Sequence, residues 1–214
     1  MLYIIGRGIF FLLCKLIFGY KIYGRYNVPK TGAVIIASNH ASYLDPIFIG
    51  IGTSRILSFM ARESLFRNLF FAKIIGMVNT FPVKRDYQDV GAMREAIARL
   101  KQKKALLLFP EGARTKDGNL QRAKAGISLL AYMASATVVP AYVKGSYEVL
   151  PKGARFVKCA PVSVYFGRTL DFDKFFKASR YNRPAEAYAP FADYIMEHIA
   201  KLKEMTNDKA QNSK

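Results

Sequence analysis

The chain has two histidines, His40 and His198, so chemistry that needs a neutral base near physiological pH has two candidates. His198 falls in a helical pattern beside Tyr194 and Ile195, which is typical of a histidine on a helix surface. His40 directly follows Ala33–Ala37, a short apolar run that predicts a buried strand. Because open α/β sheets bind ligands beyond the carboxyl ends of their strands, His40 is the stronger candidate.

Asp45 lies five residues after His40, which on a single helix would separate the two by about 140°. The two side chains can therefore meet only if the residues between them form a turn. An Asp bonded to one imidazole nitrogen would fix the tautomer and leave the other nitrogen free as a general base. Alternatively, Asp45 followed by Pro46 fits a helix N-cap with proline at the first position. In that case His40 has no chemical role, and spacing alone leaves both interpretations open.

Two further segments place charged side chains where predicted strands end. The segment FPEGART, residues 109–115, follows the strand Ala105–Phe109, and FPVKR, residues 81–85, ends a strand predicted over Asn79–Val83. Their candidate binding residues are Lys84, Arg85, Glu111, Gly112, Arg114 and Thr115. Because a guanidinium binds phosphate through two hydrogen bonds, these loops suit a substrate with hydroxyl and phosphate groups. A surface turn with an ion pair is the alternative.

The elements that position these loops alternate in the pattern of an α/β layer fold. Further strands are predicted at Ile56–Ala61, Val138–Val143 and Val162–Phe166, and helices at Leu2–Phe18, Glu63–Ile75, Asp89–Lys104, Lys124–Ala134 and Ala185–Met205. We expect a layered sandwich, with a central, mostly parallel or mixed sheet of about seven strands and helices on both faces. The expected divisions are an N-terminal anchoring helix (1–19), one domain (20–205) and a polar tail (206–214).

The net charge of the chain limits the classes of partner that it can bind. The 33 Lys and Arg outweigh the 15 Asp and Glu, which gives a formal net charge of +18 and favours nucleic acid, anionic lipid or an acidic carrier protein. The first 44 residues contain no acid but many large apolar side chains, which favours a membrane surface over nucleic acid. Two cysteines, Cys14 and Cys159, are too few for a disulfide framework and fit a reducing compartment.

The predicted helix Leu2–Phe18 is apolar apart from Arg7, Lys15 and two glycines. The two cations lie about 80° apart around a helix, on one polar stripe, which is typical of a helix lying in a lipid interface. A spanning helix, a soluble core helix and a signal peptide are the alternatives, although Tyr20, Lys21 and Tyr23 occupy the place of a cleavage site. The expected location is therefore monotopic or peripheral on the cytoplasmic face of the cell membrane.

Four segments occur in a fixed order: NHASYLD, which contains His-x4-Asp, then FPVKR, FPEGART and VVPAYV. Together they resemble the four motifs of the phospholipid and glycerol acyltransferases, in particular the bacterial enzymes that acylate 1-acyl-sn-glycerol-3-phosphate. The resemblance runs from about Ile22 to Val143.

The resemblance implies roles for the candidate residues. His40 would deprotonate a glycerol hydroxyl and Asp45 would orient the imidazole. Lys84, Arg85, Glu111, Gly112, Arg114 and Thr115 would hold the glycerol phosphate, and Pro140, in the fourth motif, would lie on the acyl-binding side. The hydroxyl would attack an acyl donor directly. The sequence contains no G-x-S-x-G nucleophile motif, which independently favours this route.

The function implied is transfer of a fatty acyl group from acyl carrier protein or CoA to the sn-2 hydroxyl of 1-acyl-sn-glycerol-3-phosphate, making phosphatidic acid. No cofactor or metal is expected, and the partners would be an anionic membrane, a lysophospholipid and the acyl donor, with no nucleic acid. An acyltransferase for lyso-ornithine lipid or lysophosphatidylglycerol is the runner-up. A basic membrane-binding module without catalysis would leave His40, Asp45, Glu111 and Arg114 unused.

Overall fold

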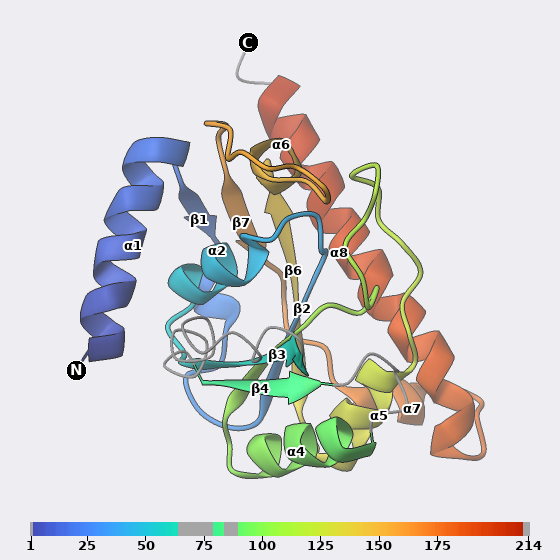
Figure 1. The fold of residues 1–214 in the computed structure, drawn as a ribbon. Helices are drawn as coiled ribbons and strands as arrows, with labels where there is room; N and C mark the ends of the chain where they lie inside the picture. The colour runs from blue at the N-terminus through green and yellow to red at the C-terminus, as the bar shows by residue number, and fades with distance from the viewer. Residues whose placement is uncertain (1, 64–78, 84–89, 212–214) are drawn as a thin grey trace.

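The protein is built on one mixed β-sheet with helices on both faces (Figure 1). The computed structural model describes residues 2–63, 79–83 and 90–211. Within these residues the strands are β1 (Lys21–Tyr23), β2 (Val34–Ser38), β3 (Leu57–Arg62), β4 (Thr80–Val83), β5 (Ala105–Leu108), β6 (Thr137–Lys144) and β7 (Ser163–Phe166). The seven strands lie in the order β1-β7-β6-β2-β5-β3-β4. Strands β2 to β6 run parallel, whereas β7 is antiparallel to β6 and parallel to β1. The predicted α/β class and strand number are confirmed.

Two layers of helices cover the sheet. The described helices are α1 (Leu2–Phe18), α2 (Asp45–Gly52), α4 (Val90–Lys101), α5 (Gly126–Met133), α6 (Ser146–Val149), α7 (Phe172–Ala178) and α8 (Tyr188–Gln211), with short 3-10 helices η1 (Arg25–Asn27) and η3 (Pro184–Ala187). Helices α1 and α2 contribute to the hydrophobic core on one face, and α4, α5, α7 and α8 to the core on the other.

Strand β2 lies at the centre of the sheet and is buried along its whole length. Val34 and Ile36 belong to the core on the α1 and α2 face, while Ile35 and Ala37 belong to the core on the opposite face. This explains the continuous apolar run, because a parallel strand covered on both faces has no solvent-facing positions. The rigid end of β2 is the support for the segment that contains His40.

Helix α1 has a packed side and an exposed side. Cys14 and Phe18 are buried, and the Phe18 ring packs edge-on against Phe48 of α2 with 5.6 Å between ring centroids. The helix ends at Phe18 as predicted, and the next residue, Gly19, has a φ of 53°, which suits the left-handed end of a helix. Six large apolar side chains are exposed along the outer side, namely Ile9, Phe10, Leu12, Leu13, Leu16 and Ile17, whereas Phe11 packs edge-on against Tyr20. None of the helices in the described residues is long and apolar enough to cross a bilayer.

Some predicted boundaries differ from the structure. Helix α8 was expected to begin at Ala185 and end near Met205, but it begins at Tyr188, after η3, and continues to Gln211. Tertiary contact explains the extension, because Thr206 is buried and its carbonyl oxygen accepts a hydrogen bond of 2.9 Å from Nζ of Lys144 in β6. The predicted helix Glu63–Ile75 lies, apart from Glu63, outside the described residues, as does Asp89.

Candidate active site

The carboxyl ends of β2 and β5 place two of the motif loops side by side. The strands pair in parallel, with Ala37 opposite Leu108, so the chain leaves both strands at the same edge of the sheet. The loops are joined there by backbone as well, because the amide of Thr115 donates to the carbonyl oxygen of His40 at 2.8 Å. The first and third motifs therefore meet at one edge of the sheet.

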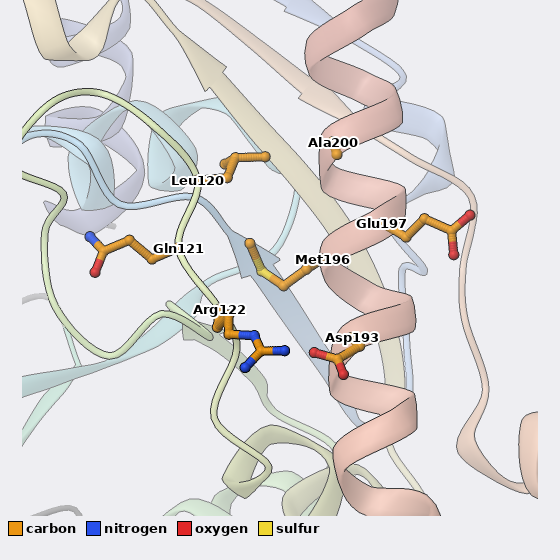
Figure 2. A pocket seen from close by; sticks show the side chains of 7 residues that line it. All are labelled: Leu120, Gln121, Arg122, Asp193, Met196, Glu197 and Ala200. Atoms are coloured by element: carbon orange, nitrogen blue, oxygen red, sulfur yellow. The ribbon is translucent and has the colours of Figure 1, made fainter.

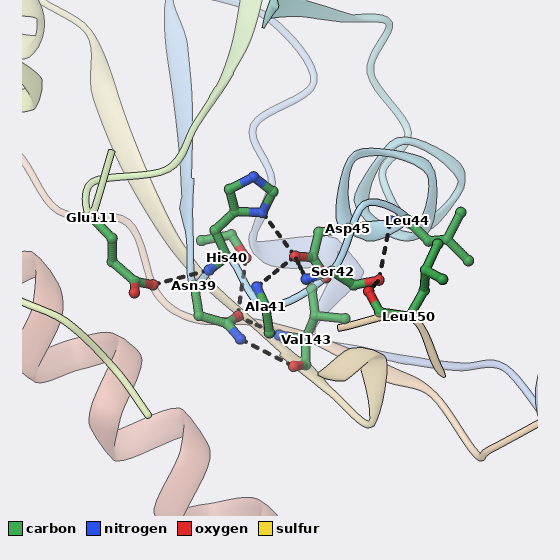
Figure 3. A network of polar contacts seen from close by, with 10 residues as sticks. Asn39, His40, Ala41, Ser42, Leu44, Asp45, Glu111, Val143 and Leu150 are labelled. Carbon is green, nitrogen blue, oxygen red and sulfur yellow. Dashed lines mark hydrogen bonds and ion pairs between the residues drawn. The ribbon is translucent and has the colours of Figure 1, made fainter. Parts of the chain in front are cut away.

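His40 and Asp45 are in contact across a turn (Figure 3). Nδ1 of His40 lies 2.9 Å from Oδ2 of Asp45, and Asp45 is fully buried whereas the His40 side chain is 18% exposed. A carboxylate at this position accepts a hydrogen bond from the N–H group at Nδ1. The proton therefore stays on Nδ1, and Nε2 keeps a free lone pair. Of the two interpretations that spacing left open, the structure has the contact between His40 and Asp45. The imidazole is held in position, and its second nitrogen can act as a base.

The same Asp45 oxygen also shapes the turn. Oδ2 accepts hydrogen bonds of 2.7 Å from the backbone amides of Ala41 and Ser42. The N-cap interpretation is wrong, because the N-cap position of α2 is Leu44 and Asp45 is the first residue of the helix. Its carboxylate points back to the preceding turn, where three donors compete for it, instead of capping amides of its own helix. The other oxygen, Oδ1, is buried and has no hydrogen-bond partner among the described residues.

Glu111 supports the His40 segment from the third motif. Oε1 accepts from the backbone amide of His40 at 2.9 Å (Figure 3), and Oε2 accepts from the amide of Gln121 at 3.2 Å. The side chain is 5% exposed. Burial raises the pKa of Glu111 from 4.5 to about 7, against the lowering effect of the two backbone amides. Because both oxygens are occupied by backbone donors, this carboxylate braces the loop that contains His40.

Arg114 of the third motif stacks on Tyr43, which lies between His40 and Asp45 in the sequence. The centre of its guanidinium group is 3.2 Å from the centroid of the Tyr43 ring, and Nη1 is buried without a hydrogen-bond partner in the part of the chain that the structure describes. Stacking on an aromatic ring orients a guanidinium without using its N–H donors.

Gly112 has a φ of 75°, which favours glycine at this point of the loop. Thr115 is buried and its hydroxyl donates to Asp117 at 2.8 Å.

Three residues that hold the site were not singled out from the sequence. The side-chain amide of Asn39 bridges to the backbone of Val143, donating to its carbonyl at 3.2 Å and accepting from its amide at 2.8 Å. Ser42 donates to the carbonyl of Leu150 at 3.0 Å. The ring of Phe109 stacks on the His40 imidazole at 3.8 Å between centroids. All three lie within the motif segments, but the sequence shows no sign of their partners.

Two predicted cations and the proline of the fourth motif complete the set. Lys84 and Arg85 lie outside the described residues, so their placement beside His40 stays a prediction. Pro140 is buried within β6, opposite Ala37 of β2, and its carbonyl oxygen accepts from the amide of Gly167 at 2.8 Å. Within residues 2–63, 79–83 and 90–211, no group of three or more His, Cys, Asp and Glu side chains could hold a metal ion.

A shallow groove lies between the segment after the third motif and α8 (Figure 2). It has a volume of about 380 Å³ and is lined by Leu120, Gln121, Arg122, Asp193, Met196, Glu197 and Ala200. Arg122 extends toward Asp193 across the groove. His40, Asp45 and Arg114 do not line it, but Gln121, whose amide donates to Glu111, does, so the groove adjoins the segment that braces His40.

Comparisons with known proteins point to one family. The sequence profile of the family described as Acyltransferase matches residues 19–144. A 1-acyl-sn-glycerol-3-phosphate acyltransferase from Bacillus subtilis is 31% identical over 140 residues, which cover 63% of this chain and 69% of that protein. A chloroplastic 1-acyl-sn-glycerol-3-phosphate acyltransferase from Arabidopsis thaliana is 28% identical over 137 residues, but this chain spans only 38% of its length.

A solved structure shows the same fold. The 1-acyl-sn-glycerophosphate acyltransferase PlsC from Thermotoga maritima superposes with a TM-score of 0.68 at 24% identity, covering 87% of this chain and 71% of that one. The solved structure shows the fold, and the profile match defines the class: enzymes that transfer acyl groups. The chain belongs to the acyltransferase family, which confirms the resemblance seen in the four motifs.

Proposed function

We propose that the protein transfers a fatty acyl group to the sn-2 hydroxyl of 1-acyl-sn-glycerol-3-phosphate and so makes phosphatidic acid. The donor would be an acyl thioester of acyl carrier protein or CoA. The observation that supports this most directly is the His40 and Asp45 pair at the end of β2, with Nδ1 bonded to the carboxylate. The choice of acceptor is supported by the relatives from Bacillus subtilis and Arabidopsis thaliana, which are 1-acyl-sn-glycerol-3-phosphate acyltransferases.

The chemistry needs one proton acceptor and one orienting group. Nε2 of His40 takes the proton of the acceptor hydroxyl while the hydroxyl oxygen forms a bond to the thioester carbonyl carbon. The C–S bond then breaks, and the leaving thiolate receives this proton from the imidazolium. Asp45, hydrogen-bonded to Nδ1, stabilises the positive charge that His40 acquires between the two steps. No covalent acyl-enzyme is formed in this route.

The acceptor phosphate would be bound by Arg114, whose buried Nη1 offers an unused donor. Burying an unpartnered cationic donor is costly, and an anion beside it would remove that cost. Lys84 and Arg85 would add positive charge from the second motif, and Thr115 and Gly112 would shape the third. Pro140 would border the acyl-binding side.

Activity on a defined acceptor is the direct test. Purified protein would be given acyl-CoA or acylated carrier protein together with 1-acyl-sn-glycerol-3-phosphate, lysophosphatidylglycerol or lyso-ornithine lipid, and the product identified by mass spectrometry. We expect phosphatidic acid, and we expect His40→Ala to lower kcat by about 10² to 10⁴. His198→Ala is the matched control, because His198 is bonded to the Tyr194 carbonyl in α8. A preferred acceptor other than 1-acyl-sn-glycerol-3-phosphate, or an active His40→Ala variant, would contradict the proposal.

We also propose that α1 docks the enzyme on an anionic bilayer through its exposed apolar side. Leu16 is 74% exposed and Leu12 57%, while Cys14 and Phe18 hold the helix on the core. Deleting the helix would remove those two core residues, so substitution on the outer side is the cleaner test. The Leu12→Glu/Leu16→Glu protein should no longer sediment with phosphatidylglycerol vesicles, whereas Met205→Glu, at an exposed apolar position of α8, should still do so. Full sedimentation of the double variant would refute this docking mode.

A further inference from the structure

The loop of residues 151–161, which connects α6 to β7, exposes an aromatic side chain that none of the described elements covers. Phe156 is 82% exposed and its neighbour Val157 is 53% exposed. Single exposed apolar residues are ordinary on protein surfaces, but two adjacent ones at the tip of a loop form a small apolar wedge. This wedge plays no part in the chemistry described above.

The loop is a built structure and not a loose connection. The amide of Lys158 donates to the carbonyl of Val149 at 2.9 Å, which closes the loop at its base, and the amide of Ala154 donates to Pro151 at 3.1 Å. The closure leaves Arg155, Phe156 and Val157 between these two points. Compact loops closed at the base can present side chains in a defined direction.

Along the chain, the charged residues that flank the wedge are all basic. From Val149 to Leu170 the chain has no Asp or Glu, and the loop itself contributes Lys152, Arg155 and Lys158, all exposed. Cations that flank exposed apolar side chains are typical of surfaces that insert into an anionic lipid interface, where the apolar groups enter the acyl boundary and the cations meet headgroups.

The position of the loop connects it both to the active site and to α1 (Figure 1). At its start, the carbonyl of Leu150 accepts from the hydroxyl of Ser42, inside the turn between His40 and Asp45. At its end, the amide of Val162 donates to the carbonyl of Phe18, the last residue of α1, at 2.9 Å. The wedge therefore lies at the active-site edge of the sheet, continuous with the helix proposed to dock on lipid.

From these observations we propose that Phe156 and Val157 insert into the anionic bilayer as a second contact beside α1, with Arg155 and Lys158 on the headgroups. Two separated contacts restrain rotation about the α1 axis, so the edge that contains His40 would face the lipid. The value of that orientation for catalysis rests on the proposed lysolipid acceptor. Insertion itself does not depend on it.

Because the chain contains no tryptophan, one can be introduced as a unique fluorescent probe. Phe156→Trp would be compared with Tyr26→Trp, since Tyr26 is 89% exposed in η1, which follows β1 at the opposite edge of the sheet. With phosphatidylcholine and phosphatidylglycerol vesicles, we expect Trp emission in the Phe156→Trp protein to shift to the blue and to be quenched by lipids brominated on the acyl chain. The Tyr26→Trp protein should show neither change.

A charge-reversal variant tests the role of the cations. Arg155→Glu/Lys158→Glu should lower partitioning into phosphatidylglycerol vesicles by at least about tenfold, because each cation near an anionic surface contributes about fivefold. Both positions are exposed, so the unfolding midpoint should be unchanged. The proposal is overturned if Trp emission in the Phe156→Trp protein stays unchanged on vesicles that still sediment it.

Acidic acyl carrier protein is the competing occupant of a basic loop. A shift of the Phe156→Trp emission with carrier protein but not with vesicles would assign the loop to the donor and would also overturn the proposal. The vesicle experiment contains no substrate, so its result is independent of the acyl-transfer assay. Insertion without transfer to any lysolipid would refute the proposed function and leave the membrane contact standing.

Discussion

Replacement of Asp45 separates the two tasks that its carboxylate performs. Oδ2 accepts from Nδ1 of His40 at 2.9 Å and from the buried amides of Ala41 and Ser42 at 2.7 Å, while Oδ1 has no partner among the described residues. In Asp45→Asn the two backbone donors select the amide oxygen for the Oδ2 position, because an NH₂ group there would face them. All three hydrogen bonds to this oxygen can then persist, while the negative charge is lost and an NH₂ group replaces Oδ1.

The expected magnitudes follow from this geometry. A neutral acceptor stabilises the imidazolium less than a carboxylate does, by roughly 1.5 to 3 kcal/mol, so kcat of Asp45→Asn should fall by about 10- to 100-fold. In Asp45→Ala two buried amides lose their acceptor, at about 1 to 3 kcal/mol each. That variant should lose about 2 to 6 kcal/mol of unfolding free energy and turn over more slowly than Asp45→Asn.

The assay is kcat at saturating donor and acceptor, measured beside urea unfolding of the same preparations. In Asp45→Asn the NH₂ group that replaces Oδ1 is buried without a hydrogen-bond partner among the described residues, so this variant should lose about 1 to 3 kcal/mol of unfolding free energy. Unchanged turnover in Asp45→Asn would refute the charge-stabilising role of Asp45. An Asp45→Ala protein as stable as Asp45→Asn would show that the amide bonds do not hold the turn.

Two other residues give measurable expectations. Burial raises the pKa of Glu111 to about 7, so the folded state keeps a proton that the unfolded chain releases near its ordinary pKa of 4.5. The free energy of unfolding should therefore fall as pH rises from about 4.5 to about 7, by on the order of 3 kcal/mol. Glu111→Gln should remove this fall in urea unfolding between about pH 5 and about pH 8, and an identical pH dependence in the variant would contradict the argument. Arg114→Ala should raise the acceptor KM by about 10- to 100-fold with little change in the donor KM, and Arg114→Lys should restore only part of the loss, because a single ammonium cannot replace the planar fork. Equal changes in both KM values would indicate a structural role for Arg114.

Much of the fold could be predicted from local pattern. The apolar run of β2 predicts a buried strand because it is covered on both faces, and the apolar spacing up to Leu100 predicts helix α4, although Val90 in that spacing is exposed. Helix α1 ends at Phe18, as expected where Gly19 follows. His40 could be selected because it follows a strand directly, and family resemblance supplied its partner in Asp45.

Only the tertiary structure decided which groups hold that pair in place. The carboxylate of Glu111 reaches the His40 amide across 71 residues, and Asn39 reaches Val143 across 104. Such contacts depend on the order and register of β2, β5 and β6, which local propensity does not determine. The N-cap assignment of Asp45 was wrong for the same reason of geometry, since local sequence favours a cap whereas the folded turn offers three donors to one oxygen. The contact between Val162 and the end of α1, which brings a basic loop beside an apolar helix, likewise exists only because β1 pairs with β7.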